Sequence, residues 1–147
     1  MITGFNHSGF VVRDLQKMVA FYRDVLGLKV MREVDATKPP LSAHVGIEGA
    51  QRYLVFVGKD NEQHQLELVY YLQPKSPDTK IERHNIGAAH VCFNVKGLDK
   101  MYQELSKKGV KFAAPLVTRE TPTGTVRICY GQDPEGNWLE FIENIPK

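Results

Sequence analysis

The chain has little of several features that would place it in a special class of protein. Only two of its 147 residues are cysteine, Cys92 and Cys129, and both lie in apolar stretches without the spacing of a metal-binding pair. We therefore expect reduced thiols in the core, as in a cytoplasmic protein, and not a disulfide framework. No apolar run is long enough to span a bilayer, and residues 1–4 lack the basic and apolar regions that open a signal peptide.

The chain also lacks an excess of either charge. It has 19 Lys and Arg residues against 17 Asp and Glu, a net charge of +2, and the two signs are interspersed. A nucleic acid or a membrane surface is therefore not expected as a partner. A hydrophobic content of 42% is ordinary for a soluble globular protein.

An internal repeat is the strongest feature of the sequence. Matched residues stand 83 positions apart in the two halves: His7 and His90, Phe10 and Phe93, Val12 and Val95, Leu15 and Leu98, Met18 and Met101. Later in each half, residues 65–69 resemble 138–142, so that Glu67 matches Glu140. The repeat predicts one α+β domain over 1–147, made of two similar modules, 1–72 and 86–147, with residues 73–85 as a linker.

Each module is predicted to form a strand, a helix and then three strands. In the first, residues 5–12 alternate in polarity, Asp14 can cap a helix with an apolar stripe, and Gly27 ends that helix. The second module repeats this order, with a polar loop expected over 118–124. The irregular stretch 35–51 is predicted to be a lid or specificity loop.

Strand parity places the two histidines and the two glutamates on comparable faces. His7 shares its face with Gly9, and His90 shares its face with Cys92, so small neighbours leave room beside each imidazole. Glu67 and Glu140 point away from the apolar residues on either side of them. Any one of these residues alone is more often structural, but the repeat favours a common role. Two imidazoles and two carboxylates suit a divalent transition metal, with positions left open for water or substrate.

Further stretches complete a pattern known from one family. Residues 21–28, residues 87–90 and the turn 133–136 before Glu140 accompany the four candidate ligands. Over nearly its whole length the chain resembles the vicinal oxygen chelate superfamily, which includes glyoxalase I, methylmalonyl-CoA epimerase, extradiol dioxygenases and bleomycin resistance proteins. The resemblance implies two βαβββ modules that form a cupped mixed sheet around a metal site.

The same resemblance implies the ligands and the assembly. The implied ligands of one divalent metal ion (Ni, Zn, Co, Mn or Fe) are His7, Glu67, His90 and Glu140. A homodimer is expected, and the site can lie within one chain or be shared between two. Bacterial glyoxalase I commonly has a glutathione-binding arginine where this chain has Val11, and an asparagine where it has Tyr71. The resemblance therefore does not carry glutathione over.

The resemblance and the ligand set favour one chemistry and leave two alternatives. The first interpretation is a metal-dependent lyase or isomerase that moves a proton next to a carbonyl, through an enediolate, on a small oxygenated substrate. Glu140, which neighbours Trp138, is the favoured base, and Glu67 is the more permanent ligand. The alternatives are an iron-dependent extradiol-type dioxygenase and a non-catalytic small-molecule binding or resistance protein.

Four further residues are candidates for contact with substrate. Tyr71 and Trp138 share the strand parity of the glutamates and are predicted to wall the pocket, although for either one alone ordinary packing is the more common role. His44 lies within the irregular stretch and Arg52 follows it directly. Both are predicted to bind an anionic group or else to lie at the solvated surface.

Overall fold

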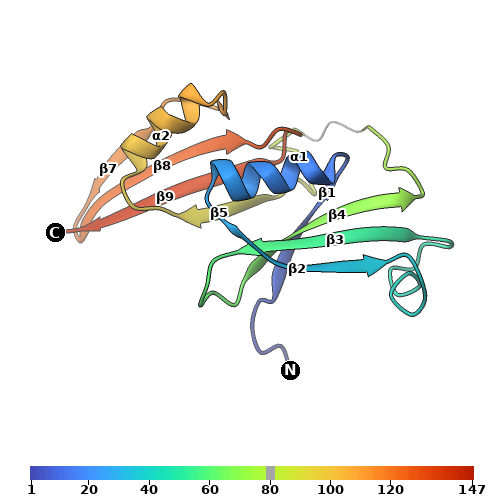
Figure 1. Cartoon of the computed structure of the whole chain (residues 1–147). Helices are drawn as coiled ribbons and strands as arrows, with labels where there is room; N and C mark the ends of the chain where they lie inside the picture. The colour runs from blue at the N-terminus through green and yellow to red at the C-terminus, as the bar shows by residue number, and fades with distance from the viewer. Residues whose placement is uncertain (79–81) are drawn as a thin grey trace. The chain divides into compact units, whose positions relative to one another are not determined.

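The computed structural model describes residues 1–78 and 82–147 and has a mixed α+β architecture (Figure 1). The chain divides into two compact units, Met1–Thr79 and Lys80–Lys147, each with its own sheet. The boundary falls inside the stretch 73–85 that the sequence marks as a linker. In the described part of the chain, no helix is long and apolar enough to cross a membrane.

The first unit has the predicted order of one strand, a helical segment and three strands. Its elements are β1 (His7–Val12), α1 (Leu15–Ala20), the π-helical turn η1 (Phe21–Val25), β2 (Lys29–Ala36), β3 (Gln51–Gly58) and β4 (Gln65–Gln73). The strand order is β1-β4-β3-β2, with β1 parallel to β4 and the other pairs antiparallel. Asp14 caps α1 as expected, because its carboxylate accepts from the Lys17 amide at 3.0 Å.

The second unit repeats this topology with one additional strand. Its elements are β5 (His90–Asn94), α2 (Leu98–Lys107), β6 (Lys111–Phe112), β7 (Val117–Thr121), β8 (Gly124–Gln132) and β9 (Trp138–Pro146). The order β5-β9-β8-β6 matches that of the first unit, again with one parallel pair, and β7 also pairs with β8. The prediction of a polar loop over 118–124 is wrong. β-branched Val117 and Thr118 suit a strand, and the pairing with β8 extends from Val117 to Thr121.

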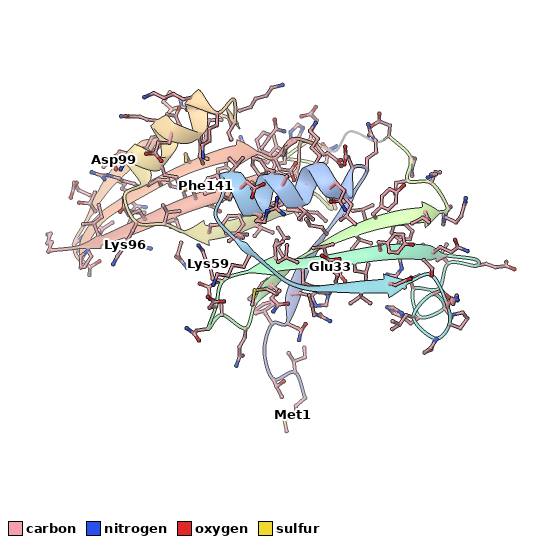
Figure 2. The ribbon with its side chains drawn as sticks, in the orientation of Figure 1. Met1, Glu33, Lys59, Lys96, Asp99 and Phe141 are labelled. Carbon is pink, nitrogen blue, oxygen red and sulfur yellow. The ribbon has the colours of Figure 1, made fainter. Side chains whose placement is uncertain are left out.

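One face of each sheet packs against its helical segment and forms the core. In the first unit, Met18 and Tyr22 of the helical segment are fully buried, as is Val12 of β1. In the second unit, Leu98 of α2 and Phe141 of β9 are buried; Figure 2 labels Phe141. Residues alternate between the faces of a strand, so the opposite face of each sheet carries the histidines and glutamates. We call this opposite face the ligand-side face of its unit.

The start of α2 is capped by a side chain from β9. Gly97, at the N-cap, has a φ of 71° and no side chain, and the carboxylate of Glu143 accepts from the amides of Gly97 and Leu98. These backbone hydrogen bonds hold the pKa of Glu143 below its usual range. Arg127 contacts both Glu143 and Asp99, which lies in the first turn of α2 (Figure 2). The cap therefore ties the helix to its sheet.

Candidate functional site

In the first unit, neighbouring parallel strands bring His7 and Glu67 together. In the register of β1 with β4, Gly9 lies opposite Glu67, two residues beyond His7. The Nε2 atom of His7 is 3.5 Å from Oε2 of Glu67. The Nδ1 atom of His7 lies 2.7 Å from Oδ1 of Asn6, an acceptor, which fixes the ring hydrogen on Nδ1. Nε2, on the side of the carboxylate, is then the ring nitrogen available to bind a cation together with Oε2 of Glu67.

The second unit repeats this pair in the same register. Cys92 lies opposite Glu140, again two residues beyond the histidine of the parallel strand. The Nε2 atom of His90 is 3.0 Å from Oε2 of Glu140. The imidazoles are 39% and 43% exposed in the two pairs, whereas the carboxylates are 16% and 14% exposed. Each pair therefore combines a largely shielded carboxylate with a ring that solvent can reach.

The residue opposite the glutamate differs between the units. A Cβ atom at Gly9 would lie 3.2 Å from Oε2 of Glu67, so glycine gives this carboxylate room over β1. At the matching position, partial desolvation and the neighbouring Glu140 carboxylate raise the pKa of Cys92 to about 11, although the side chain is still open to solvent. Cys92 is therefore a protonated thiol at neutral pH. The prediction of two core thiols is right for Cys129, which is buried, and wrong for Cys92, which is exposed on the ligand-side face.

On the strand next to each glutamate strand, an aromatic residue faces the histidine–glutamate pair. Phe56 of β3 lies opposite Glu67, and Tyr130 of β8 lies opposite Glu140. Their rings meet the histidine rings edge-on, with centroids 5.4 Å apart for His7 and 5.2 Å for His90. The two units thus share an aromatic wall beside the histidine.

Only the second aromatic residue can also donate a hydrogen bond. The Tyr130 hydroxyl donates to Oε2 of Glu140 at 2.8 Å and lies 3.3 Å from Nε2 of His90. Burial and the bond to Glu140 raise the pKa of Tyr130 to about 12, so it stays a phenol. The sequence interpretation did not include Tyr130 among the site residues. Tyr130 lies on the strand before the glutamate strand, in the position that Phe56 has in the first unit. This correspondence was the available signal.

The donor atoms of each pair suit a metal ion, but each unit alone supplies two. A neutral imidazole nitrogen and a carboxylate oxygen are ordinary ligands of first-row divalent metals. Among the residues that the structure describes, no group of three or more His, Cys, Asp or Glu side chains is placed to hold a metal. The predicted set of four ligands therefore stays a prediction.

Two of the candidate substrate residues, Arg52 and Tyr71, lie on the ligand-side face of the first unit. Arg52 of β3 is opposite Tyr71 of β4, and its Cζ atom is 5.8 Å from the centre of the Tyr71 ring. Arg52 is only 5% exposed and donates to the carbonyl of Leu41 at 2.8 Å. The structure therefore places this arginine in the interior, not at the solvated surface.

The other two candidates lie in different settings. Trp138 is half-buried at the start of β9, opposite His90, and the Arg83 guanidinium lies 4.9 Å from the centre of its ring. Arg83 also lies 5.0 Å from the ring of Tyr130, so the two aromatic residues of this face share one cation. His44 is exposed, on the connection between β2 and β3.

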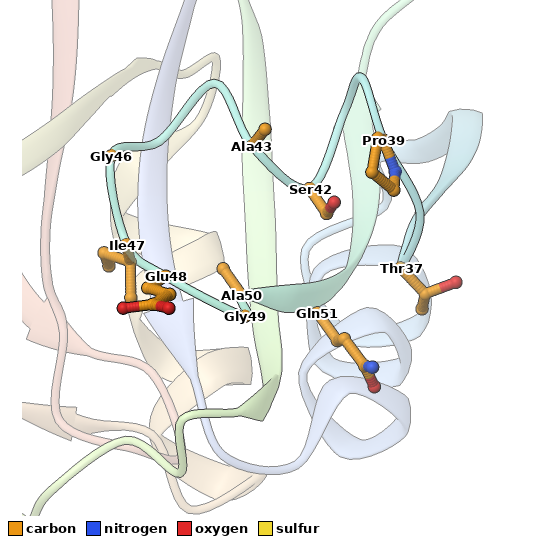
Figure 3. A pocket seen from close by; sticks show the side chains of 10 residues that line it. All are labelled: Thr37, Pro39, Ser42, Ala43, Gly46, Ile47, Glu48, Gly49, Ala50 and Gln51. Carbon is orange, nitrogen blue, oxygen red and sulfur yellow. The ribbon is translucent and has the colours of Figure 1, made fainter.

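The irregular connection between β2 and β3 forms a pocket of its own. This pocket has a volume of about 570 Å³ (Figure 3). Its lining residues are Thr37, Pro39, Ser42, Ala43, Gly46, Ile47, Glu48, Gly49, Ala50 and Gln51. They all belong to this connection or to the first residue of β3, and they include neither His44 nor any of the four predicted ligands. The role of the connection as a lid stays a prediction.

Comparison with known families agrees with this geometry. The Glyoxalase/Bleomycin resistance protein/Dioxygenase superfamily matches residues 4–141. The chain belongs to this superfamily. The resemblance drawn from the two histidines and the two glutamates is therefore confirmed, and so is the α+β fold class.

Curated relatives of the superfamily are similar to the chain at low identity. The lactoylglutathione lyase of Pseudomonas aeruginosa is 26% identical over 153 residues, which cover 95% of this chain and 81% of the lyase. The mitochondrial methylmalonyl-CoA epimerase of Mus musculus is 35% identical over 108 residues, covering 72% of this chain and 53% of the epimerase. Among solved structures, a glyoxalase family protein from Bacillus cereus has a TM-score of 0.86 at 18% identity, covering 99% of this chain and 96% of the other. At that identity the likeness shows the fold alone.

Proposed function

We propose that this protein is a metal-dependent lyase or isomerase that moves a proton on a carbon next to a carbonyl group. The observation that carries the proposal is the matching register of the two histidine–glutamate pairs, each with a shielded carboxylate beside an accessible imidazole. The names of the relatives, a lactoylglutathione lyase and a methylmalonyl-CoA epimerase, support the same class of reaction.

The proposed ligands of one divalent ion are His7, Glu67, His90 and Glu140. Two nitrogen and two oxygen donors fit a first-row metal such as Ni, Zn, Co, Mn or Fe. The fit is supported by the first pair, where Nε2 of His7 and Oε2 of Glu67 lie 3.5 Å apart while Nδ1 of His7 is bonded to Asn6. When bound, such an ion polarises a carbonyl oxygen and so stabilises the enediolate that proton removal leaves.

The residues of the chain would divide the proton transfer between them. Glu140 is the proposed base, because it is the one of the two carboxylates that a neighbouring side-chain hydroxyl orients. The hydroxyl of Tyr130 holds this carboxylate in place through Oε2. Glu67 has Phe56 in the matching position and lacks such a donor there, so it serves as the more permanent ligand.

The experiment that tests the proposal measures solvent exchange at carbon. Protein purified without chelator is assayed for bound metal, and each of the five candidate metals is then added to metal-free protein. Adducts of 2-oxoaldehydes with small thiols, and short acyl thioesters, are incubated with each form in D₂O. Deuterium at the carbon next to the carbonyl, seen only with the metal-loaded protein, is the expected result.

The same experiment separates the other candidate activities. Oxygen consumption with a catechol, without exchange on any carbonyl compound, would replace the proposal by a ring-cleaving dioxygenase. Saturable binding without turnover of either class would indicate a binding protein. We also propose that the protein is a cytoplasmic homodimer. The molar mass in solution, measured by light scattering, is the direct test of the dimer.

A further inference from the structure

Arg52 is a buried cation without an acidic partner among the described residues. Its side chain is 5% exposed, and its buried Nε atom has no hydrogen-bond partner in residues 1–78 and 82–147. The hydrogen bond that Arg52 does make runs from Nη2 to the carbonyl of Leu41. Because a guanidinium stays protonated in proteins, Arg52 cannot escape this environment by losing its proton. The structure therefore holds a positive charge that it leaves poorly compensated.

Such an arrangement is costly unless an anion completes it. A buried charge is ordinarily paired, and a buried donor without an acceptor lowers the stability of the folded state. The ring of Tyr71, 5.8 Å from Cζ, adds a weak attraction but offers no acceptor for Nε. A carboxylate or phosphate group has two oxygens at the spacing of Nε and Nη2, and would satisfy both donors at once.

The position of Arg52 connects it with the first histidine–glutamate pair. Arg52, Leu54 and Phe56 alternate along β3 and therefore share the ligand-side face, on which Phe56 lies beside His7. Leu54, Phe56 and Val69 belong to one apolar cluster, against which Tyr71 packs. The face thus has the Arg52 cation at one end, a buried apolar stretch in the middle and the His7–Glu67 pair at the other end, where the Arg32 guanidinium covers the Phe56 ring at 3.5 Å.

The length of this face limits the ligand that can use both ends. Arg52 and Phe56 are four residues apart on the strand, a separation of about 13 Å. An anionic group next to the reacting carbon is too close to that carbon to reach Arg52. An elongated substrate, with an apolar or uncharged body and a terminal oxyanion, matches the distance and the polarity.

We infer that Arg52 is the binding site for a terminal carboxylate or phosphate group of an elongated substrate. The reacting end of that substrate rests on the proposed function, whereas the oxyanion site stands on Arg52 itself. In the structure, the carbonyl of Leu41 takes the place of one oxyanion oxygen. Leu41 lies on the connection between β2 and β3, so this connection closes over Arg52 until an anion displaces the carbonyl.

The connection is built so that this exchange is local. Its backbone hydrogen bonds stay within the connection, as from Ser42 to Lys38 at 3.0 Å and from Gly46 to Ala43 at 3.2 Å. Losing the bond between Arg52 and Leu41 therefore leaves these turns intact. The anion would regain the lost hydrogen bond and add a second one to Nε.

The test uses metal-free full-length protein and three probes with the same tail. Hexanoate and hexyl phosphate carry the two possible oxyanions, and 1-hexanol has none. Binding is measured by calorimetry for the wild type, Arg52→Met, Arg52→Lys and the control Arg23→Met. Arg23 is exposed and paired with Asp24, so its loss removes the same charge from the same unit without touching Arg52.

The inference expects one-to-one binding of hexanoate, of hexyl phosphate or of both, with much weaker binding of hexanol. Arg52→Met should weaken the binding about tenfold or more, as removal of a charged hydrogen-bond donor does. Arg52→Lys should weaken it less, because the charge remains while the planar pair of donors is lost. Arg23→Met should bind as the wild type does. The inference would be overturned if the wild type bound neither anion. It would also be overturned if folded Arg52→Met bound the anion with the same affinity as the wild type.

A second measurement decides the matter if Arg52→Met does not fold. In the wild type, the NMR resonance of the Arg52 Nε–H should move on addition of the bound anion, because this donor gains its first acceptor. An unmoved Nε–H resonance at saturation would overturn the inference. Metal titrations of the same proteins are scored separately. Failure of the wild type to bind any metal would contradict the proposed function. The anion binding is measured on metal-free protein and does not depend on that outcome.

Discussion

The hydroxyl of Tyr130 donates to Oε2 of Glu140 at 2.8 Å, on the strand next to that of the glutamate. Phe56 occupies the same place opposite Glu67 and has no hydroxyl. The repeat therefore conserves an aromatic wall beside each histidine and changes the hydrogen bonding of one carboxylate only. This difference makes the two glutamates chemically unequal within an otherwise repeated frame.

Replacement of Tyr130 by phenylalanine should lower turnover more than metal affinity. The variant keeps the ring beside His90 but removes the donor that orients Glu140, a loss of about tenfold to a hundredfold for a supporting residue. Turnover and metal affinity are measured on the same preparations. The matched variant Phe56→Tyr adds a hydroxyl opposite Glu67 and should not restore activity to Tyr130→Phe. Full activity in Tyr130→Phe would contradict the positioning role.

Replacement of Gly9 by alanine should weaken metal binding. The new Cβ would lie 3.2 Å from Oε2 of Glu67, closer than ordinary contact, so the carboxylate has to shift from its place beside His7. We expect about a tenfold loss of affinity, measured by competition with a coloured chelator. Gly58→Ala is the control, because a Cβ there meets its neighbours in the same sheet at 3.5 Å, an ordinary distance. Equal affinities in the two variants would contradict the prediction.

Much of the arrangement of strands and faces can be predicted from the sequence, because it depends on local polarity patterns and on the internal repeat. The alternation of residues 5–12, the cap at Asp14 and the matched glutamates predict the strands and faces that the structure has. The register is different in kind. That Gly9 lies opposite Glu67, and Cys92 opposite Glu140, depends on pairing between strands far apart in the chain, which no local pattern encodes.

The missed features depend on strand registers and chain paths that the polarity pattern does not show. Tyr130 meets Glu140 only because β8 and β9 form a hairpin in one particular register. Arg52 is buried because the connection between β2 and β3 folds so that Leu41 reaches it, and the sequence of an irregular connection does not predict its path. The strand β7 was missed because charged Arg119 and Glu120 resemble a loop, whereas the structure pairs them with β8 across the turn at 122–123.

Replacement of Glu143 by glutamine should destabilise the second unit at neutral pH and less so in acid. The amides of Gly97 and Leu98 hold the pKa of Glu143 below its usual range. The native-state pKa is therefore lower than that of the unfolded chain. The stabilisation is complete above the unfolded-state pKa and is lost as the pH falls through the lowered native pKa.

Thermal unfolding across pH measures this effect. The melting temperature of Glu143→Gln should lie a few degrees below that of the wild type at pH 7, as for the loss of a helix cap. The two curves should converge as the pH falls through the acid range. Glu62→Gln, at an exposed position, is the control and should follow the wild type throughout. A constant difference at all pH values would show that the charge of Glu143 does not carry the cap.

The last prediction separates the roles of the two glutamates. Glu140→Gln should keep much of the metal affinity, because an amide oxygen can still coordinate. It should also lose about a hundredfold or more in turnover, the usual contribution of a general base. Glu67→Gln should lose less, because its proposed role is coordination alone. Deuterium exchange at the substrate carbon, measured with matched metal loading, reports the proton step directly. Exchange that survives in Glu140→Gln and vanishes in Glu67→Gln would reverse the assignment and make Glu67 the base.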